Sequence, residues 1–434
     1  MADYISNKAN ELKKSIIGWR RDLHKHPEPG WTEFRTAANA IKRLKELGYT
    51  IKMGTDVIAK NFMMGLPKPA QLEEAQARAI SQGADEQLVK AMTGGLTGFT
   101  AEMKFSDDST KFGLRFDMDS NDLTECNEFT HRPVKEGFAS INTGATHACG
   151  HDAHVAVGVH TAEIVAGMKD KLKGTVRFIF QPAEEGLRGA GPMVAAGVTK
   201  DLNYILGMHV SFQANANGKL VCGGKGFLAS TKWDVTFKGQ SAHAGAAPQD
   251  GHNALLAAAA ATLNMHAISR HSGGVTRINV GKMIAGEGRN VVPPNALLVM
   301  ETRGETSELN SYMVKESERI VKAAADMYAC THSIEVTGGS ESGQSDEKMI
   351  DIVEKAAKEI PYYTDITRLA NFGAGEDYAT MMSSVQEAGG IGTYVQVGID
   401  RTAGHHDAKF DINEDGLVPA TELMARSVYN VLKR

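Results

Sequence analysis

The sequence predicts an α/β protein with a mainly parallel sheet, interrupted by an inserted α+β domain. Short β-rich runs alternate with helical segments through the first half of the chain, including FGLRF, the helix after Cys149 and TVRFIF. Such alternation is typical of parallel sheets covered by helices. From about residue 230 the predicted order becomes β-α-β-β-α-β, which folds as one sheet packed against two helices.

The domain boundaries follow from this change of pattern. At 434 residues the chain exceeds the size at which one hydrophobic core keeps growing, so we expect two domains. We predict a first domain made of residues 1–229 and 339–434, and an inserted domain at 230–338. Residues 66–95 are polar, helical and bracketed by proline and glycine, and we expect them to form a two-helix insertion that fits neither domain pattern.

Composition and charge argue against several functional classes. With 42% hydrophobic and 23% charged residues, the composition is that of an ordinary globular protein. The net charge of −5 and the absence of a lysine run argue against nucleic acid and anionic lipid, so small molecules are the expected partners. The N-terminus lacks the apolar core of a signal peptide, and the richest apolar run, 254–263, is too short to span a bilayer, so we expect a cytoplasmic protein.

Polar residues are predicted at the carboxyl ends of four strands, the edge at which ligands bind in α/β sheets. They are Asp117 to Asp119 in DMD, Cys149 to Asp152 in CGHD, Glu184 and Glu185 in QPAEE, and His209 in GMHV. Each group alone has an ordinary structural explanation, such as a buried thiol or a solvated pair of glutamates. Together, thiolate, imidazole and carboxylate donors predict a site for zinc, manganese or cobalt rather than for calcium or magnesium.

The adjacent glutamates suggest a division of labour in which one binds metal and its neighbour acts as general base. A metal-activated water would then be the nucleophile, so the pattern predicts metal-assisted hydrolysis. The alternative is a Cys149 thiol nucleophile with His147 or His151 as base, which chelators would distinguish. The chain has neither the GxxxxGK[ST] phosphate loop nor the GxSxG elbow of serine hydrolases.

An ordered set of motifs resembles one known family. They are RRDLHKHPE, RFDMDS, HACGHDAH, QPAEEG, GMHV, KGQSAHAGAAPQDGHNAL, GRNVVPPNALLVMETRG, GAGEDY and GHHDAKFDI. With them the chain resembles the co-catalytic-metal exopeptidases and amidohydrolases that include aminoacylases, hippurate hydrolases and the plant auxin-conjugate hydrolases. Within that family, the segment at 66–95 and the flanking NFMMGLP and LTGFTAEM look most like the A-type subunits of aminobenzoyl-glutamate hydrolases.

The resemblance implies a catalytic domain that binds two divalent metal ions, Mn²⁺ or Zn²⁺, and a lid domain that also dimerises. The implied metal ligands are Cys149, His151, Glu185, His209 and a C-terminal histidine. Glu184 would be the general base, and Asp119 would orient a ligand from behind unless it makes an ordinary turn.

Two details of the ligand motifs stay open. His405 and His406 are adjacent, and the family spacing to Phe410 selects His406. In T-H-A-C-G-H-D, we expect Asp152 to be a helix cap or a hydrogen-bond acceptor behind the ligands, and His147 to have a structural or supporting role.

The resemblance also implies a substrate. Asn290 and Arg303 match the pair that grips the substrate's free carboxylate, and His243 matches a histidine that reaches the active site of the partner protomer and helps polarise the scissile carbonyl. The implied reaction is cleavage of the amide bond of an N-acyl amino acid, with p-aminobenzoyl-glutamate favoured by the narrower resemblance and hippurate or indoleacetyl-aspartate as alternatives. The resemblance implies a homodimer formed through the lid domain, and a related second chain is a further possible partner. The alternative to an enzyme is a non-catalytic metal-binding subunit of a larger assembly.

Overall fold

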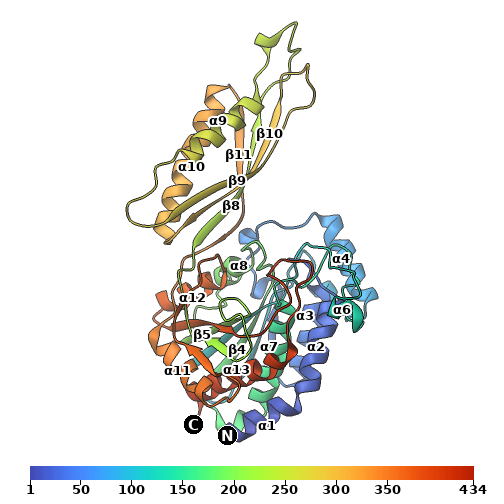
Figure 1. Cartoon of the computed structure of the whole chain (residues 1–434), viewed down its shortest axis with the longest axis vertical. Coiled ribbons are helices and arrows are strands. Elements are labelled where there is room, and N and C mark those ends of the chain that lie inside the picture. Colours follow the sequence, from blue (N-terminus) through green and yellow to red (C-terminus); the bar gives the residue numbers. More distant parts are fainter. The chain divides into compact units, whose positions relative to one another are not determined.

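The computed structural model describes residues 1–434, except for the side chain of Ala2. The chain forms two structural units (Figure 1). The first contains Met1–Lys225, Gln344–Phe372 and Asp377–Arg434, and the second contains Gly226–Gly343 with Gly373–Glu376. The second unit is therefore inserted in the sequence of the first.

The first unit is built on an eight-stranded sheet with the order β1-β2-β4-β3-β5-β14-β6-β12. Its strands are β1 (Thr50–Met53), β2 (Phe99–Lys104), β3 (Lys111–Asp117), β4 (Thr175–Gln181), β5 (Tyr204–Val210), β6 (Lys219–Val221), β12 (Asp365–Thr367) and β14 (Ile391–Val397). The four central strands, β4-β3-β5-β14, are parallel, whereas β1 and β2 extend the sheet in antiparallel fashion. This confirms the predicted α/β class with a mainly parallel central sheet. A separate two-stranded pair joins β7 (Gly224–Lys225) to β13 (Ala370–Asn371).

Helices surround this sheet. They are α1 (Ala2–Glu11), α2 (Lys13–Lys25), α3 (Phe34–Glu46), α4 (Pro69–Ser81), α5 (Glu86–Ala91), α6 (Arg132–Lys135), α7 (His151–Ala166), α8 (Ala190–Ala195), α11 (Glu347–Lys358), α12 (Tyr378–Glu387) and α13 (Leu417–Leu432). The opening helical segment is interrupted at Leu12, which ends α1 and begins α2.

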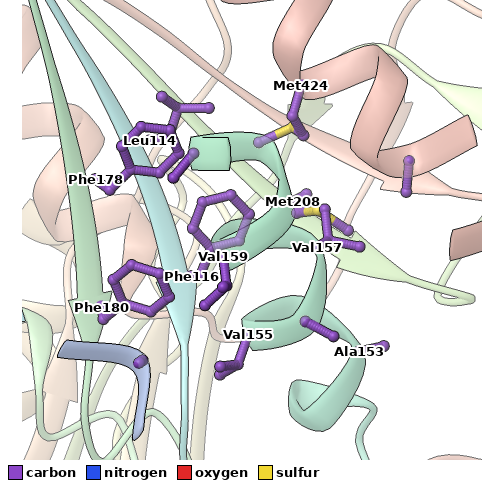
Figure 2. Close-up of a cluster of buried hydrophobic side chains, with 14 of the residues drawn as sticks. Leu114, Phe116, Ala153, Val155, Val157, Val159, Phe178, Phe180, Met208 and Met424 are labelled. Atoms are coloured by element: carbon purple, nitrogen blue, oxygen red, sulfur yellow. The ribbon is translucent and has the colours of Figure 1, made fainter. Parts of the chain in front are cut away.

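Helix α7 lies at the centre of the first unit, where it contacts β3, α2, α3 and α13. Most of its residues are buried, and the apolar ones are not confined to one face. Figure 2 shows its residues Val155 and Val159 packed beside the rings of Phe116 and Phe180. A Cβ atom at Gly158 would lie 2.8 Å from the Phe116 ring, so glycine allows the helix to approach β3 closely. This packing places the first turn of α7 at the carboxyl end of the sheet.

Helices α4 and α5 occupy the polar segment 66–95 and pack against α3. Four of their apolar side chains, Leu72, Ala75, Ala79 and Val89, are buried and join the main hydrophobic core. The segment therefore belongs to the first unit, although its sequence pattern fitted neither domain.

The second unit has a four-stranded antiparallel sheet with the order β11-β8-β10-β9. Along the chain its elements are β8 (Ala229–Lys238), α9 (Ala254–His266), β9 (Thr276–Ala285), β10 (Asn295–Gly304), α10 (Ser307–Met327) and β11 (Thr331–Ser340). Both helices contact each other and β10, and they cover one face of the sheet (Figure 1). Trp233, Val235 and Phe237 pack in this core against buried alanines of α9. Among the described residues of the whole chain, no helix has the length and apolar character needed to cross a membrane.

Candidate metal centre

The structure brings the five predicted metal ligands together in the first unit. Cys149 groups with His151 and His209 and also with Glu185 and His406, and within each group the ligand atoms lie within 4.8 Å of one another. The Sγ atom of Cys149 is 3.4 Å from Nε2 of His209. One thiol, three imidazoles and one carboxylate therefore form two groups that share Cys149, and this donor set suits divalent transition metals.

The parallel sheet explains why these residues meet. Cys149 and His151 lie at the start of α7, Glu185 follows β4, and His209 lies near the end of β5. The carboxyl ends of parallel strands share one edge of a sheet, which is where α/β proteins bind ligands. Gly150 between the first two ligands has φ 89°, and a Cβ atom there would lie 2.5 Å from the Val210 side chain. Only glycine fits that position, so the CGH sequence is a geometric requirement as well as a chemical one.

Backbone carbonyl groups fix the orientation of two of the imidazoles. Nδ1 of His151 donates to the Asp119 carbonyl oxygen at 2.8 Å, and Nδ1 of His209 donates to the Val210 carbonyl oxygen at 2.7 Å. In the neutral form of each ring, Nε2 is thereby the lone-pair nitrogen. Nε2 of His151 is buried and has no hydrogen-bond partner among the described residues. This is the tautomer that a metal-binding histidine requires, so the residues fit the expected metal.

The electrostatics of the cluster also fit a bound cation. Burial and the nearby Glu185 carboxylate raise the pKa of the Cys149 thiol well above its usual value. Burial and the neighbouring His154 lower the pKa of His209, which keeps that ring neutral. Burial opposes ionisation of Glu185, but His406 and His151 outweigh it and bring the pKa of this carboxyl to about 2. A divalent cation would supply the positive charge that the Cys149 thiolate needs.

Of the two adjacent C-terminal histidines, only His406 joins the cluster. Its Nε2 lies 3.2 Å from Oε1 of Glu185, and its backbone N–H donates to the Ala148 carbonyl oxygen at 2.9 Å. Its φ of 63° is unusual for a residue other than glycine, and strain of this kind is often found at functional sites. His405 instead donates from Nε2 to the Ser211 carbonyl oxygen at 3.0 Å, and burial lowers its pKa to about 4.

Asp119 supports the cluster from behind. Its two carboxylate oxygens accept the backbone N–H groups of Glu184 and Glu185, each at 2.9 Å. Asp119 thus holds the backbone of Glu184 and Glu185 through its carboxylate, and it orients His151 through its backbone carbonyl. Glu184 is only 8% exposed and groups with His151 and Glu185. The general-base candidate is therefore next to the ligands.

A second buried histidine, His154, supports the site and was not predicted from the sequence. Its Nδ1 hydrogen-bonds Oδ1 of Asp117, and its Nε2 accepts the N–H of Val210 at 3.0 Å. The ring thereby holds the end of β5 beside His209. The spacing of His151 and His154, three residues apart in a helix, was the available signal, because such residues share a face.

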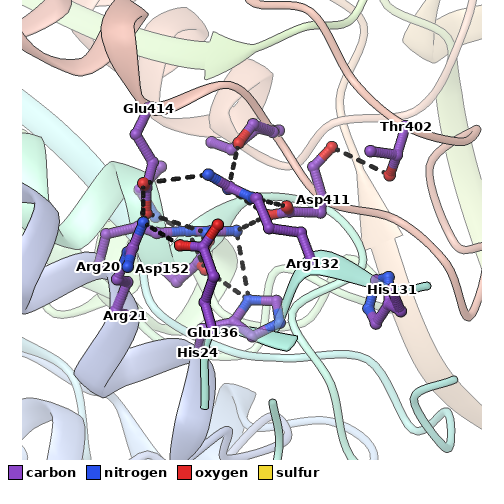
Figure 3. Close-up of polar contacts among 12 residues, drawn as sticks. Arg20, Arg21, His24, His131, Arg132, Glu136, Asp152, Thr402, Asp411 and Glu414 are labelled. Carbon is purple, nitrogen blue, oxygen red and sulfur yellow. Dashed lines mark hydrogen bonds and ion pairs between the residues drawn. The ribbon is translucent and has the colours of Figure 1, made fainter. Parts of the chain in front are cut away.

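Asp152 and His147 lie outside the ligand cluster. Asp152 was expected to be a helix cap or a hydrogen-bond acceptor behind the ligands. It is not the cap, because Gly150 occupies the N-cap position and Asp152 is the second helical residue. The Asp152 carboxylate instead binds Nε of Arg20 at 2.9 Å and Nδ1 of His24 at 2.8 Å (Figure 3). His147 is buried, neither of its ring nitrogens has a hydrogen-bond partner among the described residues, and burial lowers its pKa to about 3.

The remaining predicted residues belong to the second unit. Nδ1 of His243 accepts the N–H groups of Gly245 and Ala246 at 3.1 and 3.0 Å, so the proton of the neutral ring is on the exposed Nε2. Asn290 is close by, because its carbonyl oxygen accepts the N–H of Ala244 at 3.0 Å.

Arg303 lies on β10 and is already paired within its own strand. Its guanidinium binds both carboxylate oxygens of Glu301, at 2.9 and 3.0 Å. Such two-point binding is the geometry by which arginine recognises a carboxylate.

Comparison with known proteins gives consistent results. The family model for peptidase family M20/M25/M40 matches residues 113–430. The chain is 42% identical over 421 residues to the indole-3-acetyl-aspartic acid hydrolase of Enterobacter agglomerans, covering 97% of this chain and 96% of that protein. It is also 42% identical over 422 residues to the A-type subunit of the p-aminobenzoyl-glutamate hydrolase of Escherichia coli K12, covering 97% of both chains.

Solved structures agree with this assignment. The crystal structure of the aminobenzoyl-glutamate utilization protein from Klebsiella pneumoniae superposes with a TM-score of 0.84, at 36% identity and over 98% of both chains. A dinuclear metal-binding peptidase of the M20 family from Bacillus subtilis shares the fold, with a TM-score of 0.67 at 24% identity over 98% of this chain and 99% of the other. The motif order, the strand-end cluster and these matches together show that this chain belongs to peptidase family M20/M25/M40.

Proposed function

We propose that this chain is a metal-dependent amidohydrolase that cleaves the amide bond of an N-acyl amino acid and uses two divalent ions per chain. The observation that carries the proposal is the convergence of five ligand-type side chains beside Glu184 in a member of a peptidase family. The proposed metal ligands are Cys149, His151, Glu185, His209 and His406. Zn²⁺ and Mn²⁺ are the candidate ions, because thiolate favours zinc while cellular availability can favour manganese.

Glu184 is the proposed general base. When bound, the metal ions would supply Lewis acidity and lower the pKa of a coordinated water. Glu184 takes the proton of the attacking water and returns it to the nitrogen of the leaving amine, so that one carboxylate serves both halves of the reaction. Its backbone is held by Asp119, which limits how far its carboxylate can drift from the reacting atoms.

The second unit provides the proposed substrate contacts. Arg303 and Asn290 hold the free carboxylate of the substrate, and because Arg303 is bound to Glu301, that carboxylate must share or displace an existing partner. His243 is proposed to act on the active site of the partner protomer in a homodimer. The contacts of its Nδ1 leave Nε2–H as a donor, which is the form that can hydrogen-bond a developing oxyanion.

The names of the two relatives suggest the substrate class. Indole-3-acetyl-aspartic acid and p-aminobenzoyl-glutamate both carry an aromatic acyl group on an acidic amino acid. We propose that this chain acts on such a conjugate, with p-aminobenzoyl-glutamate as the first candidate. Indoleacetyl-aspartate is the second, since the two relatives are equally identical to this chain. Because one relative is named as a single subunit of its hydrolase, a related second chain is also a candidate partner here.

A substrate panel on the purified chain tests the proposal. The metal-free protein would be reloaded with Mn²⁺ or Zn²⁺ and assayed with p-aminobenzoyl-glutamate, indoleacetyl-aspartate, hippurate and N-acetyl-glutamate. We expect no activity without metal and a preference for aromatic acyl groups. Activity that survives exhaustive phenanthroline treatment but is lost to iodoacetamide would instead support the Cys149 nucleophile. A metal-loaded chain that is inactive on every substrate would indicate a non-catalytic subunit.

The role of His243 has its own test. Inactive His243→Ala and Glu184→Ala protomers would be mixed under conditions of proven exchange between dimers. If His243 acts across a dimer, one site of each mixed dimer has both residues, so activity should reappear. No recovery would show that His243 does not act in trans.

A further inference from the structure

The segment that carries Glu184 and Glu185 has an unusual backbone. As the chain leaves β4, Ala183 has φ 51°, Gly186 has φ 111° and Leu187 has φ 63°. Left-handed conformations at residues other than glycine persist only where neighbouring groups hold them. The directions in which the two glutamates point therefore depend on what holds this turn.

Three buried carboxylates bind the backbone N–H groups of the turn and of the residues after it. Asp119 accepts those of Glu184 and Glu185, as described above. Asp377 accepts those of Gly189 and Ala190 at 3.1 and 3.0 Å. The third is Glu33, whose Oε1 accepts the N–H of Ala183 at 2.8 Å.

Glu33 has no exposed surface and is 150 residues away from Ala183 in the sequence. It directly precedes α3 and belongs to the segment HPEPGWTEF, none of whose residues has a role in the mechanism proposed above. Its second oxygen, Oε2, is 2.6 Å from the Thr97 hydroxyl. Each oxygen thus has a hydrogen-bond partner, and one of those partners is Ala183, the residue directly before Glu184.

The surroundings of Glu33 favour its neutral form. Burial and the charge of Asp119 raise its pKa to about 8. In the charged form Oε2 accepts from the Thr97 hydroxyl, and in the protonated form Oε2–H can donate to the same hydroxyl oxygen. Oε1 accepts the Ala183 N–H in both forms. A glutamine could reproduce both contacts, with its amide oxygen toward Ala183 and its NH₂ toward Thr97.

We propose that Glu33 is a positioning residue for hydrolysis, which holds Ala183 in its left-handed conformation and thereby directs Glu184 and Glu185 toward the metal centre. The inference rests on the roles proposed above for these two glutamates. Glu33 itself touches neither substrate nor metal in this scheme.

Glu28 provides a matched control in the same segment. It is also a fully buried glutamate, and its oxygens accept the N–H groups of Arg35 and Thr36 at 2.9 and 2.8 Å. Those groups belong to the first turn of α3, so the Glu28 side chain supports a helix and not the glutamate turn. Loss of Glu28 should affect folding alone.

The test compares Glu33→Ala, Glu33→Gln, Glu33→Asp and Glu28→Ala with the wild-type chain. For each we would measure kcat and KM on the substrate that wild type hydrolyses, the Mn²⁺ affinity of the metal-free protein by calorimetry, and Tm. Glu33→Ala should lower kcat roughly 10²-fold, because displacement of a catalytic group by about 1 Å has an effect of this size. Its KM should change little, because the residues proposed to bind the substrate carboxylate, Arg303 and Asn290, are not altered.

The Mn²⁺ affinity of Glu33→Ala should fall by roughly 10- to 100-fold, as for other residues that support a ligand from behind. Glu33→Gln should retain most of the kcat and the Mn²⁺ affinity. Glu33→Asp is one methylene too short to reach Ala183 and should resemble Glu33→Ala, which keeps the test decisive if the alanine variant does not fold. Glu28→Ala should lower Tm without changing kcat per folded, metal-loaded molecule.

Three results would overturn the proposal. The first is wild-type kcat and Mn²⁺ affinity in both Glu33→Ala and Glu33→Asp. The second is an impairment in Glu33→Gln equal to that of Glu33→Ala. The third is that Glu28→Ala loses as much kcat and Mn²⁺ affinity as a Glu33 variant with the same drop in Tm. Failure of the proposed function would look different. In that case the wild-type chain hydrolyses no N-acyl amino acid, while the Mn²⁺ affinities of the same variants still test the positioning role.

Discussion

Two polar clusters in the first unit both contain histidines and carboxylates but differ in how these side chains are used. One is the candidate metal centre. The other, which we call the arginine network, contains Arg20, Arg21, His24, Arg132, Asp152, Asp411 and Glu414 (Figure 3). Both clusters contact the first turn of α7, and the neighbours His151 and Asp152 belong to different ones.

In the arginine network the charges bind each other. Arg20 has no exposed side-chain surface and lies 2.9 Å from Asp152, 2.7 Å from Asp411 and 3.4 Å from Glu414. Arg132 binds the last two carboxylates as well. Since Asp411 follows the segment that carries His406, this network ties that segment to α2 and α7.

In the metal centre, the backbone holds two of the histidine rings through the nitrogen that faces away from the other ligands. Nδ1 of His151 and of His209 is held by a carbonyl oxygen, while Nε2 faces the other donors. The comparison teaches that residue type alone does not mark a metal site. A polar cluster stabilises the fold when its donors and acceptors satisfy each other, and it is suited to bind a ligand when lone pairs are held in place but left free.

The largest effect is expected at Glu184. Replacement of Glu184 by Gln removes the proton acceptor but keeps the shape of the side chain. We expect kcat to fall by roughly 10²- to 10⁴-fold, the usual contribution of a general base, with both metals retained. Steady-state kinetics and metal analysis check this, and a variant with wild-type kcat would refute the base assignment.

The next test separates the two clusters at adjacent residues. Asp152→Ala leaves Arg20 buried with one partner fewer, and breaking a buried ion pair costs about 3–5 kcal/mol of unfolding free energy. His151→Ala should instead abolish tight Mn²⁺ binding and change the stability of the metal-free protein less. Urea unfolding and calorimetric Mn²⁺ titration of both variants measure this. Equal loss of stability in both would show that the clusters do not differ as described.

A smaller effect is expected at Asp119. This carboxylate accepts two backbone N–H groups, whereas asparagine has one acceptor oxygen and an NH₂ group that would face the second N–H. Asp119→Asn should therefore weaken Mn²⁺ binding by roughly 10- to 100-fold. Isothermal titration checks this, with His405→Gln as the control that should bind Mn²⁺ like wild type.

The smallest effect concerns pH. Burial alone would raise the pKa of Asp152, but the charges of Arg20 and His24 hold it well below its usual value, and the pKa values of Asp411 and Glu414 are lowered in the same way. The folded state thus binds protons less readily than the unfolded chain. The resulting stability is fully present above about pH 4, the pKa of these carboxyl groups in the unfolded chain, and is lost as the pH falls toward their lower folded pKa values. Each tenfold difference in proton affinity between the two states corresponds to about 1.4 kcal/mol.

His24 acts in the opposite direction. Its burial and Arg20 oppose protonation, but Asp152 and Glu125 raise its pKa overall, so its contribution is present below about pH 6.5 and is lost as the pH rises through the folded pKa. The test measures the unfolding free energy of the metal-free wild type and of metal-free Asp152→Asn between pH 7 and pH 3. The variant should lose less stability below pH 4 than wild type. Parallel curves would show that Asp152 does not carry the acid sensitivity.

Much of the fold and of the candidate site was predictable. The alternation of β-rich and helical segments predicts the parallel sheet because periodicity and turn residues are local properties. Strand ends then predict where Glu185 and His209 meet, because parallel strands end at one edge. Cys149 does not follow a strand, because it lies just before α7. The general chemistry followed from the donor types, which are visible in the sequence itself.

The sequence by itself thus determined the class of the fold, the family and the set of donors. The tertiary structure decided which atoms meet: that His406 and not His405 faces Glu185, that Asp152 binds Arg20 instead of capping α7, and that Glu33 holds Ala183. The physical reason is that hydrogen bonds and ion pairs require distances near 3 Å between specific atoms. Contacts between residues more than a hundred positions apart depend on the packing of the whole sheet and its helices, which no local pattern records.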